Sequence, residues 1–529
     1  MKQQQWKAGL IVALLVAMAG SVALAGAGAA APAPAKQPAK TAPAPAKEPA
    51  KAPASPKHDV ELLWPVLHNP FPPLTMGLDF RFRIEYGENW QTLNDSHNPA
   101  ARDRNHEFEY ERYRTRWWTK WALGDVSFNT RLTWEPRTWD EPEYKTWYSY
   151  ARPGDDNPNL REFNPDEALF DWFNINWRNI FGLPVSATIG RQDMRFGVGW
   201  LVMDATPLDG SRTLYFDAGR FTFNWEDAKT VLDLVYISQA AESDRWLEPI
   251  CDQDRAVTEQ DEHGAILYLT NKLLKNMQLE GFVIYKNDNP INTHVSNIST
   301  GLEPRWSRKA EIFTYGAAVA GTPEEHWSYR AEAAIQGGHK VNEYSSQESQ
   351  SICAFGALTN LEYLFKDRLD NRVHVGYEYA SGDDPGTHGT NEQFDLLWGE
   401  WPRYSELLIY TATLETSPAE LTNLHRFNIG HSFNLTKWWT ITLDYHALWA
   451  AQPGNSVATG ATGLNVADRS EFHEGERFRG CLFTGWAKYK FSDQLYGHLL
   501  GEYFMPGAYF QSPSDDDAFF LRFNLEFIF

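Results

Sequence analysis

The sequence predicts an all-β fold, a transmembrane antiparallel β-barrel of about eighteen strands with an aqueous lumen. Two patterns carry this prediction. Segments of about ten residues alternate apolar and polar side chains, and long connections between these segments alternate with short ones. Beyond the N-terminus, the chain also has no run of about 18 apolar residues, which an ordinary membrane-spanning helix would require.

The N-terminus has the pattern of a secretory signal peptide. Lys2 and Lys7 precede the apolar run 10–16, and Ala-Leu-Ala at 23–25 offers a cleavage site with small residues at its two outer positions. A membrane anchor is the alternative, although the apolar run is short. We assign residues 1–25 to a signal peptide and expect the mature chain to be exported.

The next segment, residues 26–58, consists mostly of Ala, Pro and Lys. Proline at this density favours extended polyproline II, a semi-rigid spacer of ~3.1 Å per residue. We predict a periplasmic linker here, followed by the barrel over residues 76–529. Contact between the linker lysines and an anionic cell-wall polymer is the alternative to a plain spacer.

The C-terminal segment shows the strand pattern most clearly. Arg522, Asn524 and Glu526 share one face. The opposite, apolar face carries Phe519, Leu521, Phe523, Leu525, Phe527 and Phe529. Similar alternation recurs at 79–85 and 441–449. A water-soluble β-sandwich also alternates, but its strands average nearer five or six residues.

The connections provide a second, independent pattern. Short turns such as 123–125 separate nine long polar stretches, so nine long and eight short connections join eighteen strands. The long stretches lie at about 86–107, 136–167, 193–213, 240–262, 287–311, 338–350, 381–420, 450–479 and 505–518. An apolar run at 407–410 would add a nineteenth strand, against the even number usual in bacterial barrels. We place it in the 381–420 loop and expect it to fold against the barrel wall or mouth.

Composition and motifs exclude several classes of protein. The formal net charge of −21 argues against a nucleic-acid interface, which needs a basic face. Three scattered cysteines suit neither a disulfide framework nor a zinc site. The sequence has no nucleophile elbow and no HExxH motif, and its acidic runs lack the spacing of a calcium loop. We therefore predict no enzymatic activity, no cofactor and no metal site.

The polar faces of the predicted strands are rich in arginine. Side chains on these faces should point into the lumen and set the selectivity of a channel. They include Arg112, Arg114, Arg116, Arg131, Arg178, Arg220, Arg330, Arg372, Arg426 and Arg522. Arginine suits carboxylate or sulfate recognition because its planar fork binds two oxygens. The same faces carry acids such as Asp233, Glu280 and Glu378, so structural pairing across neighbouring strands is the alternative.

A motif in the middle of the chain resembles the alginate-export family of outer-membrane barrels. Gly190-Arg191-Gln192 is followed by Arg-Thr at 212–213 and by Phe-Asp-Ala-Gly-Arg at 216–220. Residues 214–215 stand as an insertion relative to the family pattern. A second similarity is Ser-Gly-Asp-Asp at 381–384, followed by Phe-Asp at 394–395.

The resemblance implies passage of an anionic uronic-acid polymer through an arginine-lined pore. By match to the motif, Arg191 and Arg220 would lie on the substrate path, and Arg212 and Asp217 would form a pair that holds a loop. It also implies a location in the outer membrane of a Gram-negative-type bacterium. Membrane lipid and the barrel-assembly machinery would then be partners.

These observations lead to one functional hypothesis with two alternatives. The hypothesis is an outer-membrane channel for passive passage of an anionic, alginate-like poly- or oligosaccharide. A porin for other small solutes is the first alternative. A secreted, soluble β-rich protein that binds or cleaves carbohydrate is the second, because it would also explain the 22 tryptophans.

Overall fold

The structure is a computed structural model. It describes residues 67–89, 93, 107–141, 163–165, 167–203, 215–241, 244–252, 258, 260–289, 309–341, 349–384, 386–387, 389–400, 403–407, 422–453, 473–512 and 515–529. The predicted signal peptide and linker lie outside these residues and remain predictions. Within the described part, no helix is both long and apolar enough to cross a membrane.

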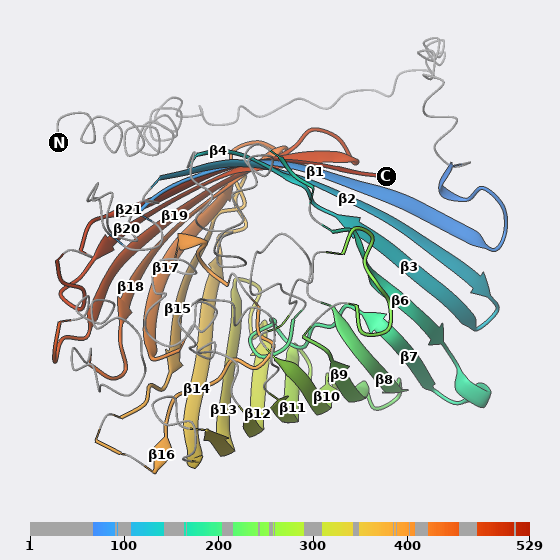
Figure 1. Cartoon of the computed structure of the whole chain (residues 1–529), viewed down its shortest axis with the longest axis horizontal. Helices are drawn as coiled ribbons and strands as arrows, with labels where there is room; N and C mark the ends of the chain where they lie inside the picture. The colour runs from blue at the N-terminus through green and yellow to red at the C-terminus, as the bar shows by residue number, and fades with distance from the viewer. Residues whose placement is uncertain are drawn as a thin grey trace, which may run out of the picture. The chain divides into compact units, whose positions relative to one another are not determined.

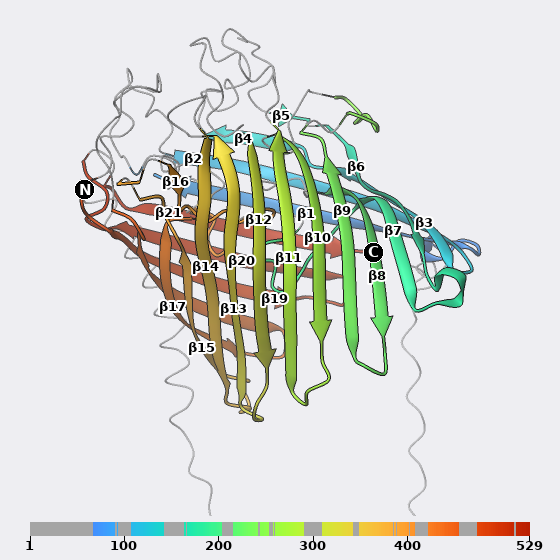
Figure 2. The same cartoon turned by 90° about the horizontal axis from the view of Figure 1, so that it is seen from below.

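Eighteen long strands in the described part form one closed antiparallel barrel (Figures 1 and 2). They are β1 (Leu74–Glu88), β2 (Glu107–Leu123), β3 (Val126–Trp134), β6 (Leu169–Trp177), β7 (Val185–Gln192), β8 (Phe216–Trp225), β9 (Thr230–Gln239), β10 (Asp261–Asn271), β11 (Met277–Asn289), β12 (Ala310–Gly321), β13 (Trp327–Val341), β14 (Ser349–Leu364), β15 (Arg372–Ala380), β17 (Leu424–Asn434), β18 (Trp439–Trp449), β19 (Phe478–Lys490), β20 (Leu495–Pro506) and β21 (Ala518–Ile528). Three short strands lie in long connections: β4 (Arg137–Glu141), β5 (Phe163–Asn164) and β16 (Thr390–Asn391).

The predicted number of strands and the order of connections are confirmed. Long and short connections alternate, except that the β13–β14 connection is no longer than the short β6–β7 and β14–β15 connections, and the short ones lie together at one rim of the barrel (Figure 2). The shortest connection contains only Gly124 and Asp125, and Gly124 adopts a φ of 62°, which glycine tolerates at no steric cost. The first strand begins at Leu74, close to the predicted residue 76.

Side chains alternate between the two faces of the wall, as the period-two pattern predicts. On β21, Leu521 is 42% exposed on the outer face, whereas the neighbouring Arg522 is 3% exposed on the inner face. The same alternation holds around the barrel, where many outward apolar side chains remain accessible. The outer face therefore offers an apolar surface to lipid, and the inner face collects the charges.

A charged group joins the two ends of the sheet where the barrel closes. β1 pairs with β21, and this register sets Glu85 opposite Arg522. The Glu85 carboxylate accepts a hydrogen bond from Arg522 and another, of 2.9 Å, from Arg112 on β2. Glu85 is fully buried, so these two guanidinium groups replace the water that its charge would otherwise require.

Two connections fold into the barrel instead of away from it. The first inward segment, residues 193–203, follows β7, and the second inward segment, residues 389–400 and 403–407, follows β15. They pair with each other through backbone hydrogen bonds of 2.7 and 3.0 Å between residues 201–203 and Trp398. The rings of Trp200 and Phe394 stack with their centroids 5.3 Å apart. One inward segment thus supports the other.

The inward segments cover an apolar part of the inner wall, which the polar-lumen prediction does not include. Inward side chains of β9 to β14 form one buried cluster with the segments: Val235, Ile237, Ile266, Tyr268, Phe282, Ile284, Ile312, Ile352, Ala354 and Leu358. Aromatic rings of the second inward segment pack against two glycines of this wall. A Cβ at Gly356 would lie 2.6 Å from the Phe394 ring, and one at Gly264 would lie 2.3 Å from the Trp398 ring. The missing side chains therefore create the space that the rings occupy.

The buried Glu85 carboxylate should be essential for closure of the barrel. We expect Glu85→Gln to lower the free energy of unfolding by about 3–5 kcal/mol, because Arg112 and Arg522 lose their shared buried counter-charge. Urea unfolding of the purified barrel in detergent measures this. Glu526→Gln is the matched control, since the Glu526 side chain is 20% exposed and its ion pair with Arg114, at 3.2 Å, is partly accessible to water. If Glu85→Gln and Glu526→Gln lowered the free energy of unfolding equally, the proposed role of Glu85 in closing the barrel would be contradicted.

The two glycines should control the position of the second inward segment. We expect Gly264→Val combined with Gly356→Val to displace Phe394 and Trp398 from the wall, because their rings occupy the space of the added side chains. Single-channel conductance should then become larger and noisier in a barrel that remains folded. Gly281→Val is the control, because no atom lies within 4 Å of a Cβ built there. Wild-type conductance in the double variant would refute this explanation.

Candidate functional site: the charged inner wall

Five arginines of β1 and β2 share the inner face of the wall. Figure 1 shows these two strands across the barrel from β9 to β14, whose inner face is apolar and covered. β1 supplies Arg81 and Arg83, and β2 supplies Arg112, Arg114 and Arg116. The register sets Arg81 opposite Arg114 and Arg83 opposite Arg112. Like charges directly across a strand pair repel each other, so this arrangement needs counter-charges from elsewhere. We call these five side chains the arginine strip.

Two buried carboxylates behind the arginine strip supply part of that counter-charge. Glu85 contacts Arg112, as described above. Glu135, just beyond the end of β3, accepts hydrogen bonds of 2.6 Å from Arg81 and 2.7 Å from Arg112. Burial alone would raise the pKa of Glu135, but Arg112 and Arg81 overcome this effect and hold the pKa below its ordinary value. Glu135 therefore stays ionised between the two arginines.

The remaining members of the arginine strip are less tightly enclosed. Arg114 pairs with Glu526 at 3.2 Å, and Arg116 lies 3.9 Å from Asp171. Arg83 donates a hydrogen bond of 2.7 Å to the uncharged amide oxygen of Asn524. The side chains of Arg114 and Arg116 are 11% and 14% exposed, whereas Glu85 and Glu135 are fully buried. Arg114 and Arg116 are thus more exposed to the lumen than Glu85 and Glu135, whereas Glu526, the partner of Arg114, is itself 20% exposed.

Arg131 extends the charged wall onto β3. Its guanidinium binds both oxygens of Asp171, at 2.7 and 2.8 Å, and both oxygens of Asp193, at 3.0 and 3.1 Å. It also lies 4.0 Å from the ring centroid of Trp172. Asp193 begins the first inward segment, so Arg131 attaches that segment to the wall.

The Gly190-Arg191-Gln192 motif has a structural explanation at the end of β7. Gly190 adopts a φ of 116°, and a Cβ there would lie 2.4 Å from the backbone oxygen of Phe173. The Gln192 side chain donates hydrogen bonds to backbone oxygens on β7 and β8, including a 2.9 Å bond to Ala218. Together these residues fix the point at which the chain turns into the lumen.

Arg191, a predicted member of the substrate path, is only 1% exposed. It binds both oxygens of Asp217, at 3.1 and 3.3 Å, and the backbone oxygen of Phe170 at 3.0 Å. Its guanidinium lies 3.8 Å from the ring centroid of Tyr215. The predicted partner of Asp217 was Arg212, which lies outside the described residues. Within the described part, the pair that holds this region is Arg191 with Asp217.

Every arginine predicted for the substrate path lies within 3.9 Å of a carboxylate. Besides those already described, the pairs are Arg220 with Asp233, Arg330 with Glu280 and Glu332, Arg372 with Asp370, Arg426 with Glu378, and Arg522 with Glu85 and Glu406. Arg372 differs in location, because it lies next to a short connection and is 44% exposed. Arg178 also lies at the short-connection rim, where it donates to the backbone oxygen of Gly124. The structural ladders considered in the sequence analysis are therefore present throughout the inner wall.

The second inward segment ends in five residues, 403–407, that cross several strands. Arg403 pairs with Glu378 of β15 at 3.2 Å, and the Tyr404 ring centroid lies 4.4 Å from the guanidinium of Arg426 on β17. These contacts anchor the segment on the side of the barrel where β15 and β17 meet.

The same five residues also reach the strands next to the closure. The Ser405 hydroxyl donates a hydrogen bond of 2.6 Å to Glu502 of β20, and the backbone N–H of Leu407 donates one of 3.2 Å. Glu406 pairs with Arg522 of β21 at 2.6 Å. Leu407 is fully buried, so the predicted contact of this loop with the wall is confirmed for the described part of the 407–410 run.

Sequence patterns do not single out several charged residues of this site, among them Arg81, Arg83, Glu135 and Arg403. Arg81 and Arg83 lie on the polar face of a strand that the alternation identifies, and extending the lumen assignment to this strand would have included them. Glu135 and Arg403 lie in connections, where no periodic pattern indicates which way a side chain points.

Comparisons with known proteins agree with this architecture. OccAB1 of Acinetobacter baumannii is 9% identical with a TM-score of 0.51, over 87% of this chain and 97% of that chain. OccK9 (OpdG) of Pseudomonas aeruginosa is 10% identical with a TM-score of 0.50, over 86% of this chain and 99% of that chain. At this identity, the similarity shows the fold alone. No curated protein matches the chain.

The family comparison covers most of the barrel. The alginate-export family profile matches residues 73–519, from just before β1 into β21. The predicted resemblance is therefore confirmed, and the predicted outer-membrane location follows from the family and the fold. The chain belongs to the alginate-export family and is a channel-forming β-barrel of the Gram-negative outer membrane.

Proposed function

We propose that the protein is a passive channel for an anionic, alginate-like poly- or oligosaccharide. The observation that carries this proposal is the arginine strip on the inner wall of β1 and β2. A uronic acid carries one carboxylate per sugar, and a guanidinium group binds a carboxylate through two parallel hydrogen bonds. Membership of the alginate-export family supports the same class of substrate.

The arrangement of charge supports a path along the arginine strip. Glu85 and Glu135 lie behind it without exposure, whereas Arg114 and Arg116 reach the lumen. A solute in the lumen therefore meets these two arginines, together with the partly exposed Glu526, before it meets the two buried carboxylates. In a space with low-dielectric walls, such an arrangement raises the local concentration of anions.

Existing ion pairs make the proposed binding weak, which suits transport. A carboxylate that approaches Arg114 competes with Glu526, which already accepts a hydrogen bond from it. The guanidinium therefore exchanges one oxygen partner for another, and the net gain in free energy is small. Conduction requires sites that bind strongly enough to admit a solute and weakly enough to release it.

A second candidate is a porin for smaller anions. The observation that favours it is the pair of inward segments, which occupy the lumen beside β9 to β14. They reduce the space that a hydrated polymer needs, while a monosaccharide or a small carboxylate requires less. Both candidates use the same arginine strip and differ in the size of the solute that passes.

Removing the accessible positive charge should alter selectivity without unfolding the barrel. We expect Arg83→Gln, Arg114→Gln and Arg116→Gln together to lower the anion-over-cation permeability ratio several-fold, most strongly at low ionic strength. The reversal potential in a KCl gradient measures this. The control combines Arg178→Gln, Lys275→Gln and Arg372→Gln, three exposed cations at the short-connection rim.

The outcome separates the two candidates. An unchanged permeability ratio in a folded triple variant would refute the anion path. If the ratio falls, block of the wild-type current by oligouronates of increasing length tests the substrate. Block that strengthens with length supports the saccharide channel, and block by monouronate alone supports the small-anion porin.

A further inference from the structure

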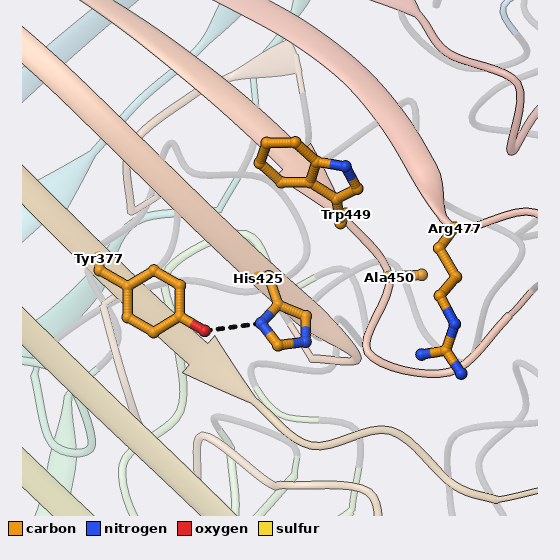
Figure 3. Close-up of a pocket in the computed structure, with 5 residues that line it drawn as sticks. All are labelled: Tyr377, His425, Trp449, Ala450 and Arg477. Atoms are coloured by element: carbon orange, nitrogen blue, oxygen red, sulfur yellow. Dashed lines mark hydrogen bonds between the residues drawn. The ribbon is translucent and has the colours of Figure 1, made fainter.

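A pocket of about 360 Å³ lies at the ends of β15, β17 and β18 (Figure 3). Its lining residues are Tyr377, His425, Trp449, Ala450 and Arg477. Arg477 immediately precedes β19, and Ala450 immediately follows β18. These ends lie at the rim formed by the long connections. In outer-membrane barrels the long connections face the cell exterior.

The alternation of the strands places this pocket on the outer surface of the barrel. Glu378 and Arg426 point inward, so their chain neighbours Tyr377 and His425 point outward. Trp449 is directly opposite His425 in the register and is 38% exposed. The pocket therefore opens toward lipid and not toward the lumen where the proposed anion path lies.

The lining combines aromatic rings with one cation. The Tyr377 hydroxyl and the His425 Nδ1 are 2.7 Å apart, which fixes two of the rings relative to each other (Figure 3). The Trp449 ring packs against Phe478, with centroids 5.4 Å apart. Arg477 is exposed and donates one hydrogen bond to the backbone oxygen of Ala451, which holds the side chain beside the pocket. None of the five lining residues is acidic.

We propose that this pocket binds the phosphorylated headgroup of a glycolipid in the outer leaflet. Arginine binds phosphate through charge-assisted hydrogen bonds. Tryptophan and tyrosine lie preferentially at the membrane interface, where an apolar ring meets acyl chains and a polar tip meets headgroups. The pocket places these two chemistries side by side on the outer face, at the ends of the strands that cross the membrane. A soluble anion gains nothing from the lipid-facing rings, so the geometry favours the lipid.

Native mass spectrometry of the purified barrel in detergent, titrated with bisphosphorylated lipid A, tests the proposal. We expect Arg477→Gln to weaken binding about tenfold, as expected for the loss of a charged hydrogen-bond donor. Arg477→Lys should retain most of the affinity. Lys437→Gln is the matched control, because Lys437 lies 4.6 Å from the Trp438 ring centroid at the opposite rim.

Two comparisons with the wild-type protein keep the test independent of the variants. Lipid A without its phosphates should bind at least tenfold more weakly than the bisphosphorylated form. Oligouronate at concentrations that block the channel should not displace the lipid. Equal binding of the dephosphorylated lipid, displacement by oligouronate, or wild-type affinity in Arg477→Gln would each overturn the proposal.

Discussion

The constraint on which the structure depends is the absence of water around the backbone in a membrane. Each buried N–H and C=O group must find a partner in the protein, and a closed ring of strands satisfies this requirement without leaving an edge. Pairing of β1 with β21 completes the ring. Once it is closed, each side chain of the wall faces either lipid or lumen, and the charges collect inside.

Like charges on the inner face repel each other, and nearby acids compensate this repulsion. Arg81, Arg83, Arg112 and Arg114 face each other across two strands, and the nearest compensating acids come partly from other parts of the chain. Glu135 reaches them from a connection, and Arg522 joins through Glu85. The ion pairs therefore tie strands together that are far apart in sequence, so the charged wall contributes to the fold as well as to the chemistry of the lumen.

The sequence predicts the parts of this structure that repeat. Alternation on β21 assigns Arg522 and Asn524 to the lumen, and the order of long and short connections gives the number of strands. It does not predict the first inward segment, and of the second it predicts only the contact of the 407–410 run with the wall. Trp200, Phe394 and Arg403 lie in connections, where no periodic pattern indicates the direction of a side chain. The sequence does not indicate the role of Gly264 or Gly356 either. Gly264 makes room for the ring of Trp398, and Gly356 makes room for the ring of Phe394.

The Arg191 pair shows the same dependence on tertiary contacts. The motif identifies Arg191 and Asp217 as important, but the contact between them becomes visible only when β7 and β8 lie side by side. The predicted partner, Arg212, was chosen from its place in the motif. A motif shows which residues recur in a family, whereas the strand register determines which residues contact each other.

The inner wall of β1 and β2 differs in chemistry from the inner wall of β9 to β14. Because these strands lie on opposite sides of the barrel, the chemistry changes across the channel and not along it. β1 and β2 present guanidinium groups, while β9 to β14 are covered by aromatic and aliphatic side chains of the inward segments. A solute between them experiences a transverse field and a transverse gradient of polarity. If a sugar with a carboxylate on one edge and C–H bonds on a face uses the proposed path, it would therefore enter in one orientation. On that path, the lumen would select a molecule by the angle at which it travels as well as by its size and charge.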